Sequence, residues 1–216
     1  MNSRSHFYAR LEALCEREVQ CFPPDIFPAY YRTAAVLLLL WAEQNGAVKL
    51  ALTRRTNTLP SHKGHVSFPG GGMLETDPSP EVTALRETEE ELGIRPQDIR
   101  VMGRLDDAWS RAGFHIIPYV GWTDRPPVFN PDPREVDDII VADVATLMQP
   151  EISCVHEVAE TDQQRTTHAF SWDGGYVWGV TADILLELLL WIQGESSNRR
   201  DCRLDLMKKQ LEAMNR

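Results

Sequence analysis

The sequence predicts an α/β protein in which a mixed β-sheet lies between helices. Two strand-like runs at residues 33–42 and 48–54 are joined by an Asn-Gly pair, which is a typical hairpin turn. Helix-like segments follow at residues 80–92 and 182–193, with further strand-like runs between them. Strands and helices that alternate in this way are typical of layered α/β structures.

Both ends of the chain are expected to be helical extensions of one domain. Residues 1–20 mix charged and apolar side chains as an amphipathic helix does, and the turn residues of "CFPPDIFP" end it. Residues 196–216 are charged and have a helical pattern. A chain of 216 residues without a repeat or a linker is short for two domains. We therefore expect one domain, 1–216, with its core at about residues 30–193.

The segment before the first central helix is long and rich in Gly, Pro, Ser and Thr, and a loop of that length is usually functional. The helix itself can be capped by Asp77 or Ser79 and carries Pro80 in its first turn. Gly93 is expected to end it in the left-handed conformation. The apolar stripe of this helix is expected to consist of Val82, Leu85 and Leu92.

The second half of the chain continues the alternation. The runs "VMGRLDDAW" and "GFHIIPYVGWT" are predicted to be strands, and "VDDIIVADVATLM" a strand followed by a short helix. "HAFSW" and "YVWGV" are predicted to form a hairpin around Asp173 and Gly174. Thr181 is expected to cap the apolar helix "ADILLELLLWIQ".

Composition and charge restrict the classes of function. A net charge of -10 and a pI near 5.1 argue against a general nucleic-acid binder. The longest apolar run, Ala34 to Ala42, is far shorter than the roughly 20 residues of a membrane span. The four cysteines show no CxxC spacing, and the N-terminus lacks the apolar region of a signal peptide. We therefore expect a cytoplasmic protein with reduced thiols and with neither nucleic acid nor membrane as partner.

The helix at residues 80–92 carries an unusual density of glutamates. At about 100° per residue, Glu87, Glu90 and Glu91 fall on one side of it, and Glu89 points away. Like charges at this spacing repel. The face is either simply solvated, or it supplies the oxygen ligands that a hard cation such as Mg²⁺ prefers, beside a glycine-rich loop that permits close approach of the backbone.

The stretch "GGGMLETDPSPEVTALRETEEELGI" resembles the Nudix box, in which a glycine and a spacer precede Arg-Glu-x-x-Glu-Glu-x-Gly and an aliphatic residue. The matching positions are Arg86, Glu87, Glu90, Glu91, Gly93 and Ile94. The acidic residue that usually lies eight positions before the arginine is replaced by Pro78, with Asp77 one position earlier. This spacer is similar to that of the coenzyme A pyrophosphatase branch. The resemblance implies a Nudix-like α/β/α sandwich with a mixed sheet.

The upstream stretch "ALTRRTNTLPSHKGHVSFPGG" is similar to a further motif of that branch, Leu-Leu-Thr-x-Arg followed by Gly and then Phe-Pro-Gly-Gly. An arginine of the motif falls on Pro60, which places the substrate in question but not the hydrolase chemistry. The resemblance extends from about Thr33 to Trp191. It implies Mg²⁺- or Mn²⁺-dependent hydrolysis of a diphosphate linkage in coenzyme A or acyl-CoA.

The resemblance also implies roles for individual residues. The metal is expected on Glu87, Glu90, Glu91 and a carbonyl of the glycine loop, taken as Gly71. The catalytic group is expected to comprise Glu90, Glu87, Arg86 and, as a remote acid or base, Glu135. Substrate contacts are expected at Arg55, His62, Gly64 and Phe68.

Two other functions remain open from the sequence. The first is a Nudix hydrolase of another nucleoside diphosphate derivative, such as ADP-ribose or a dinucleotide. The second is a non-catalytic binding module, which the presence of all three box glutamates disfavours. The general base is either a box glutamate or a residue of a distant loop. The partner is expected to be a small molecule, and a homodimer is possible.

Overall fold

The computed structural model describes residues 3–23, 26–56, 64–159 and 164–195. The α-helices are α1 (Ser3–Glu12), α2 (Pro80–Leu92), α3 (Val144–Leu147) and α4 (Gly179–Gln193). The 3₁₀ helices are η1 (Ala13–Glu16), η3 (Pro96–Asp98) and η4 (Pro150–Ile152). The strands are β1 (Arg32–Ala42), β2 (Val48–Arg55), β3 (Val66–Ser67), β4 (Gly70–Gly72), β5 (Arg100–Arg104), β6 (Ala108–Ser110), β7 (Phe114–Thr123), β8 (Val136–Asp143), β9 (Ser153–Ala159), β10 (Gln164–Trp172) and β11 (Gly175–Trp178).

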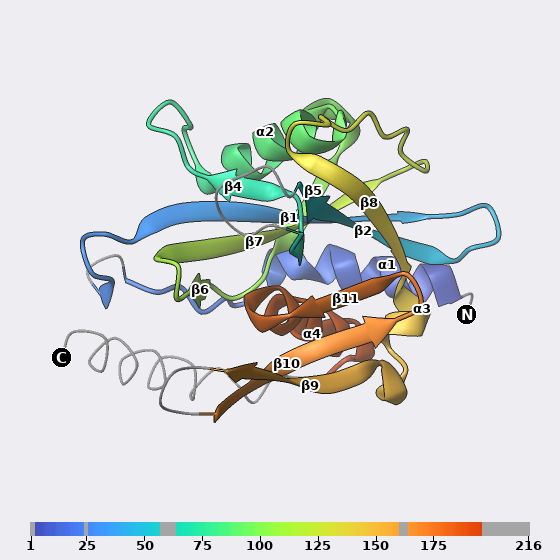
Figure 1. The fold of residues 1–216 in the computed structure, drawn as a ribbon. Helices are drawn as coiled ribbons and strands as arrows, with labels where there is room; N and C mark the ends of the chain where they lie inside the picture. The colour runs from blue at the N-terminus through green and yellow to red at the C-terminus, as the bar shows by residue number, and fades with distance from the viewer. Residues whose placement is uncertain (1–2, 24–25, 57–63, 160–163, 196–216) are drawn as a thin grey trace.

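The main sheet is mixed, as the sequence predicts. Its strands follow the order β3-β2-β1-β7-β5, with β4 also paired to β1, β6 to β7 and β8 to β2. β1 and β7 run parallel, whereas β1 and β2 form the expected antiparallel hairpin. Gly46 has a φ of 85° in the connecting turn, which glycine adopts without strain. The sheet lies in the middle of the molecule, with α2 on one side and α1 and α4 on the other (Figure 1).

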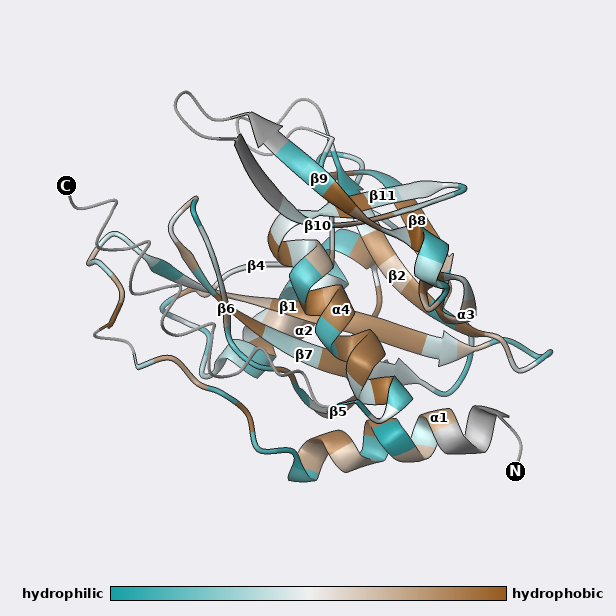
Figure 2. Ribbon diagram, turned by 90° about the horizontal axis from the view of Figure 1, so that it is seen from below, coloured by the Kyte–Doolittle hydropathy of each residue, from teal (hydrophilic) through white to brown (hydrophobic). Residues whose placement is uncertain are grey.

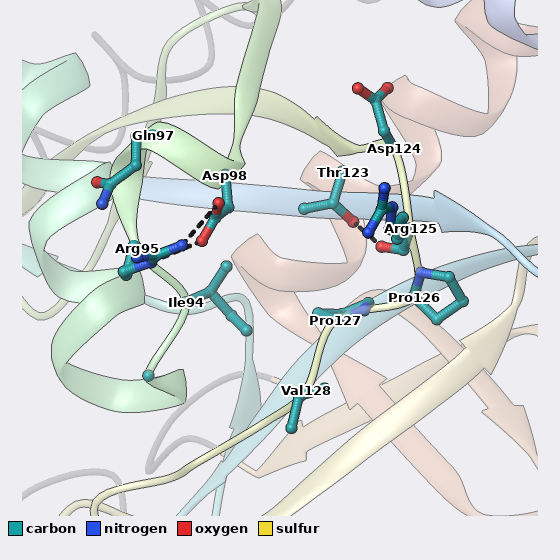
Figure 3. Close-up of a pocket in the computed structure, with 11 residues that line it drawn as sticks. Ile94, Arg95, Gln97, Asp98, Thr123, Asp124, Arg125, Pro126, Pro127 and Val128 are labelled. Atoms are coloured by element: carbon teal, nitrogen blue, oxygen red, sulfur yellow. Dashed lines mark hydrogen bonds and ion pairs between the residues drawn. The ribbon is translucent and has the colours of Figure 1, made fainter.

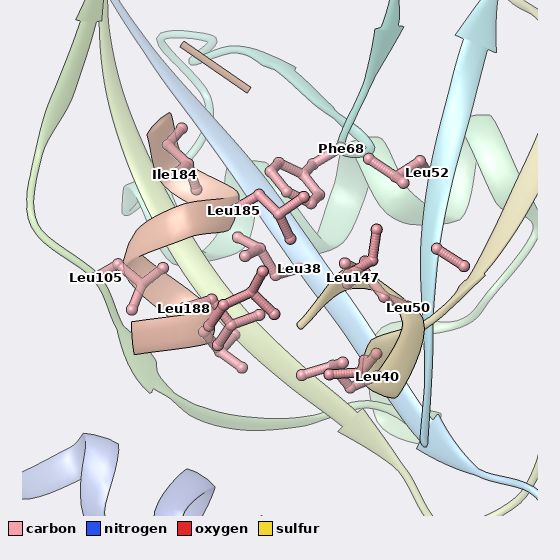
Figure 4. Close-up of a cluster of buried hydrophobic side chains, with 14 of the residues drawn as sticks. Leu38, Leu40, Leu50, Leu52, Phe68, Leu105, Leu147, Ile184, Leu185 and Leu188 are labelled. Atoms are coloured by element: carbon pink, nitrogen blue, oxygen red, sulfur yellow. The ribbon is translucent and has the colours of Figure 1, made fainter. Parts of the chain in front are cut away.

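Alternation along β1 explains why the sheet is covered on both faces. One face of β1 packs on α2, where Ala35, Leu37 and Leu39 of the strand cluster with Ala84 and Leu92 of the helix. The other face packs on α4, where Leu38 and Leu40 of the strand cluster with Leu185 and Leu188 of the helix (Figure 4). These packed layers confirm the predicted α/β/α arrangement and fix the position of α2 over the sheet.

A second sheet of three antiparallel strands, β11-β10-β9, lies alongside α4 (Figures 1 and 2). The β10–β11 hairpin was expected, but β9 and its pairing with β10 were not. Strand β9 contains Ser153, Cys154, His156 and Glu157, a polar run that gives little apolar signal. It pairs antiparallel with β10, the next strand along the chain, from Ala159 opposite Gln164 to Ser153 opposite Phe170.

Three expectations about local structure are corrected. Helix α4 begins at Gly179 after Trp178, so Thr181 lies inside the helix and does not cap it. Of the expected apolar stripe of α2, Leu92 is buried and Leu85 packs against the core, but Val82 is 37% exposed. The other buried residues of this helix are Thr83, Ala84, Thr88 and Glu91. The predicted strand at residues 101–109 is split into β5 and β6, with two buried aspartates between them.

The amino-terminal extension is shorter as a helix than expected and is packed on α4. α1 and η1 together end at Glu16. Arg10 donates to the carbonyl of Trp191 at 2.6 Å, and the indole Nε1 of Trp191 donates to the carbonyl of Arg10 at 2.8 Å. The expected helical extension at residues 196–216 lies outside the described residues. Over the described part of the chain, every helix is too short or too polar to cross a bilayer.

Candidate active site

The backbone of the glycine strand β4 contacts two glutamates of helix α2. β4 pairs with β1, which holds it over the sheet. A Cβ atom added to Gly71 would lie 2.5 Å from the carboxyl of Glu87. The amide N–H of Gly70 donates to Oε2 of Glu91 at 3.2 Å. Glycine at these positions therefore permits the backbone to touch the acidic face of the helix.

Helix α2 is well delimited, so the register of its glutamates is fixed. The hydroxyl of Ser79 accepts from the amide of Val82 and caps the helix, with Pro80 in the first turn. Gly93 ends it with a φ of 72°. Of the two capping candidates, Ser79 is confirmed, and Asp77 is used elsewhere.

Asp77 forms a two-bond ion pair with Arg86. Nε and Nη2 of Arg86 lie 3.1 and 3.0 Å from the two carboxylate oxygens of Asp77. The amide of Leu74 and the hydroxyl of Thr83 also donate to Asp77. The hydrogen bonds from Arg86 hold the pKa of Asp77 at about 2, with a smaller contribution from the Leu74 amide. Asp77 thus anchors the spacer to helix α2 through Arg86 and Thr83.

Arg86 also joins two of the box glutamates. Its Nη2 lies 2.9 Å from Oε1 of Glu87, and its Nη1 lies 2.9 Å from Oε2 of Glu90. Nη2 further donates to the carbonyl of Gly72 at 3.2 Å. The guanidinium therefore connects the glycine loop, the spacer and the acidic helix face, which suits the orienting role expected of it.

Glu91 is a buried carboxyl. Its residue is 5% exposed, and burial raises the pKa of Glu91 to about 8, against the hydrogen bond from Gly70 that lowers it. Among smaller effects, Glu87 and Glu135 raise this pKa and Arg55 lowers it. Burial also raises the pKa of Glu87, opposed by Arg86 and reinforced by Glu90 and Glu135.

Glu135, from a segment far along the chain, acts on the same carboxyls. It precedes β8 and contributes to the raised pKa of both Glu87 and Glu91. The backbone of this segment is held by Thr56, whose amide donates to the carbonyl of Glu135 at 3.0 Å and whose hydroxyl donates to that of Arg134. The structure therefore brings Glu135 into electrostatic range of the box.

The three box glutamates do not share one centre in this conformation. Within the described residues, no group of three or more acidic, histidine or cysteine side chains is arranged to hold a metal ion. Glu90, with 55% of its side chain exposed, turns to Arg86, and Glu91 turns to Gly70. The expectation of convergence is corrected in this respect, because an arginine and an amide neutralise the repulsion that a cation would otherwise offset.

The donor chemistry nevertheless fits a hard divalent cation. The available groups are carboxylate oxygens, which are of the type that Mg²⁺ or Mn²⁺ takes, and strand β4 contacts two of them through Gly70 and Gly71. Carboxylates outnumber the cationic side chains around them, and two of the carboxyls have raised pKa values for that reason and because of burial. A bound cation would offset both the repulsion between the carboxylates and the free-energy cost of burying them in charged form.

The residues expected to contact substrate fall in different places. Arg55 is half-buried, and its Nε is a buried nitrogen that has no hydrogen-bond partner among the described residues. Gly64, with a φ of 66°, donates its amide to the carbonyl of Arg55 at 3.1 Å. Phe68 is 2% exposed within the core, so the expected substrate contact is corrected to a packing role. His62 lies outside the described residues.

A pocket in the structure lies away from these groups. It is bounded by the end of α2 and the loop after β7, with a volume of about 550 Å³, and its lining includes Arg95, Asp98 and Arg125 (Figure 3). Arg95 is ion-paired with Asp98 at 2.8 Å. None of the expected catalytic or substrate residues lines this pocket, so it is not the candidate site.

Sequence reasoning missed two contributions. The sequence suggested Asp77 as a helix cap and as a departure in the spacer, but not as the partner of Arg86 nine residues later. The contacts of Trp178 with His65 and His156 were also missed, because these residues come from separate segments of the chain.

Comparisons with known proteins agree with the resemblance of this segment to the Nudix box. The family model described as NUDIX domain matches residues 31–166. Nudix hydrolase 22, chloroplastic, of Arabidopsis thaliana is 34% identical over 173 residues, which are 76% of this chain and 57% of that protein. Nudix hydrolase 15, mitochondrial, of the same plant is 32% identical, and 59% of its length is covered. This chain thus spans little more than half the length of the two plant relatives.

A bacterial relative is covered more fully, and two solved structures share the fold. The Nudix hydrolase NudL of Pectobacterium atrosepticum is 36% identical over 172 residues, which are 79% of this chain and 88% of that protein. The NUDIX domain of Shewanella oneidensis NrtR, solved with ADP ribose, has a TM-score of 0.50 at 18% identity and covers 80% of this chain and 92% of its own. A MutT/nudix family protein from Enterococcus faecalis has a TM-score of 0.50 at 16% identity, covering 83% of this chain and 71% of its own.

Proposed function

We propose that this chain, which belongs to the NUDIX domain family, is a pyrophosphohydrolase that cleaves the diphosphate linkage of a nucleoside diphosphate derivative with Mg²⁺ or Mn²⁺. The observation that carries the proposal is the contact of β4 with α2. Gly71 packs on the carboxyl of Glu87, and the amide of Gly70 donates to Glu91, so the glycine strand contacts two of the box carboxyls. Glu135 adds a further carboxylate within electrostatic range.

The residues of this chain would divide the chemistry as follows. Glu87, Glu90, Glu91 and the carbonyl of Gly71 would hold the cation, which, when bound, neutralises charge on phosphate oxygens and lowers the pKa of a bound water. Arg86 would orient Glu87 and Glu90 through its ion pairs.

Arg55 and Glu135 would act on the substrate and the water. The buried Nε of Arg55 lacks a hydrogen-bond partner within the described part of the chain, and a phosphate oxygen would satisfy it. Glu135 would accept the proton of the attacking water, since it faces the box from outside the helix. The box glutamates are the alternative proton acceptor.

We favour coenzyme A or acyl-CoA as the substrate. The support is the similarity of Leu52, Thr53, Arg55, Gly64 and Phe68–Gly71 to the upstream motif of the coenzyme A pyrophosphatase branch. In that case water would attack the diphosphate and release adenosine 3′,5′-bisphosphate and 4′-phosphopantetheine or its acyl derivative. ADP-ribose is the second candidate, because the similar NrtR domain was solved with ADP ribose and Pro60 replaces an arginine of the motif.

A substrate panel tests the proposal. The protein with Mg²⁺ is incubated with coenzyme A, acetyl-CoA, ADP-ribose and a diadenosine polyphosphate, and the products are separated by chromatography. Release of adenosine 3′,5′-bisphosphate together with 4′-phosphopantetheine would establish coenzyme A cleavage. AMP together with ribose 5-phosphate from ADP-ribose would establish the second candidate. Absence of hydrolysis with either cation would favour the non-catalytic binding module.

A further inference from the structure

A group of aromatic and imidazole rings lies where β3 meets the small sheet. The rings of His65 and Trp178 are 5.4 Å apart with an interplanar angle of 62°. The rings of His156 and Trp178 stack at 4.6 Å and 27°. Nδ1 of His156 lies 2.6 Å from the hydroxyl of Tyr176. We refer to His65, His156, Tyr176 and Trp178 as the ring platform.

The ring platform is adjacent to the proposed diphosphate contacts. The amide N–H of Arg55 donates to the carbonyl of His65 at 3.0 Å, so these two residues are cross-strand neighbours. The guanidinium of Arg55 is in turn within electrostatic range of Glu91. A ligand whose phosphates reach Arg55 would therefore bring its next chemical group toward the ring platform.

The small sheet turns these rings away from the core. Phe170 pairs with Val177, and both are buried in the core. Trp178 pairs with Ala169 and Tyr176 with Ser171, and by strand alternation these pairs occupy the opposite face. The stacked rings of His156 and Trp178 thus lie on the outer side of this sheet.

The rings are held firmly but are not covered. Tyr176 is 39% exposed, His65 is exposed, and Trp178 is half-buried. A stack that served only to join β3 to the small sheet would not need this accessible surface.

We propose that the ring platform binds the nucleobase of the substrate by stacking, an inference that rests on the proposed function. Aromatic side chains provide flat, rigid surfaces on which any purine can lie, and stacking requires no hydrogen bonds that read the base. The indole of Trp178 is the main surface, and His156, fixed by Tyr176, supports it from the side.

Binding of AMP and of ribose 5-phosphate, which differ only in the base, tests the proposal. Calorimetry is performed in Mg²⁺ on the wild type, Trp178→Leu and Trp178→Phe. We expect Trp178→Leu to weaken AMP binding about 10-fold and Trp178→Phe to restore most of it, because a ring remains. Ribose 5-phosphate affinity should change less than about twofold in both variants.

The matched control is Trp172→Leu, which makes the same change in the same sheet. Trp172 pairs with Gly175, so by alternation it lies on the core side, where it packs against buried residues. This variant should retain the ratio of AMP to ribose 5-phosphate affinity. A loss of that ratio equal to the loss in Trp178→Leu would overturn the proposal, as would an unchanged AMP affinity in Trp178→Leu.

Nuclear magnetic resonance of the wild type keeps the test decisive if Trp178→Leu does not fold. The indole N–H signal of Trp178 is assigned from its absence in Trp178→Phe. AMP should shift this signal and ribose 5-phosphate should not, and equal shifts or none would contradict the proposal. A wild type that binds AMP at Trp178 but hydrolyses no diphosphate would refute the proposed function alone.

Discussion

The ion pairs of Arg86 offset the repulsion between glutamates on the acidic helix. On the sequence alone, Glu87 and Glu90 are like charges that repel. In the structure both are paired with the Arg86 guanidinium, which also binds Asp77 by two hydrogen bonds. Glu91 is buried against β4, forms no ion pair with the described residues, and has a pKa raised by burial to about 8. The three box glutamates should therefore respond differently to substitution.

Replacing Glu90 or Glu91 by glutamine should nearly abolish turnover, because each substitution removes charge that holds the cation. The two substitutions should differ in their effect on stability, because Glu91 is buried and Glu90 is exposed. Glu90→Gln and Glu91→Gln should each lower diphosphate hydrolysis by orders of magnitude, because Gln has the shape but not the charge that holds the cation. Without metal, Glu91→Gln should hold or raise the melting temperature, since the wild type must bury this carboxyl either charged or after taking up a proton. Glu90→Gln should change it little, since an exposed pair contributes about 0–1 kcal/mol.

The measurement is a Mg²⁺ titration of activity, combined with thermal unfolding in EDTA. Glu89→Gln is the matched control, since Glu89 is exposed on the other side of the same helix. If turnover of Glu90→Gln and Glu91→Gln equals that of Glu89→Gln at limiting Mg²⁺, the helix face is only a solvated acidic surface.

The ion pair of Asp77 should contribute stability that depends on pH. The pKa of Asp77 falls from 3.8 to about 2 on folding, mainly through the hydrogen bonds from Arg86. A carboxyl with a lowered folded pKa stabilises the protein fully above its unfolded pKa and loses this contribution as the pH falls through the folded one. The difference in melting temperature between the wild type and Asp77→Asn should therefore be full above pH 4.5 or so and shrink toward pH 2.

Thermal unfolding of both proteins between pH 7 and pH 2.5 or so, in metal-free buffer, measures this difference. A difference that is constant across the range would mean that the charge of Asp77 is not what stabilises the spacer.

At the scale of elements, the contact of β4 with α2 depends on the absence of side chains. Gly70 has a φ of 150° and lies against the backbone of β1, and Gly71 lies against Glu87. Gly72, the next residue, has open space where a Cβ would be. The three glycines look equivalent in the sequence, but they differ in what surrounds them.

Gly71→Ala should therefore damage the site, and Gly72→Ala should not. A Cβ at Gly71 would lie 2.5 Å from the Glu87 carboxyl, which must move away from its position beside Arg86. We expect a higher Mg²⁺ requirement and lower turnover for Gly71→Ala, with a melting temperature within a few degrees of the wild type, because the displaced group ends a flexible side chain. Equal Mg²⁺ requirements for the two alanine variants would contradict this reading of the contact.

At the scale of the whole molecule, the amino-terminal segment outside the NUDIX match is part of the core. Nη2 of Arg17 lies 3.0 Å from Asp106 and 2.6 Å from Glu187, and all three side chains are at most 4% exposed. Asp106 comes from the loop between β5 and β6, and Glu187 from α4. Arg17 thus links three parts of the chain that are far apart in sequence.

Removing Arg17 should destabilise the protein strongly. Arg17→Met retains the apolar stem but leaves two buried carboxylates without this partner, which typically costs about 3–5 kcal/mol of unfolding free energy. Arg95→Met removes an exposed ion pair with Asp98 and should cost less than about 1 kcal/mol.

Urea unfolding of both variants gives the two free energies. The expected difference between the two losses of unfolding free energy would disappear if water entered around Asp106 and Glu187. A loss for Arg17→Met no larger than that for Arg95→Met would therefore show that this cluster is not sealed.

Local sequence alone determined the elements whose signals lie within a few residues. These are the β1–β2 hairpin with its Asn-Gly turn, helix α2 between Ser79 and Gly93, and the order of acids along it. The alternation of strand-like and helix-like segments also predicted that the sheet lies between helices. The resemblance to the Nudix family rested on Arg86, Glu87, Glu90 and Glu91 at their spacing, and the family match over residues 31–166 confirms it.

Only the tertiary structure decided which of these groups meet. Asp77 pairs with Arg86 across the spacer, and Glu135, from the segment before β8, acts electrostatically on the box glutamates. The same holds for the ring platform and for the partners of Arg17. These contacts join segments whose separation along the chain carries no periodic signal, and their free energy arises from burial and charge pairing, which exist only once the layers have packed.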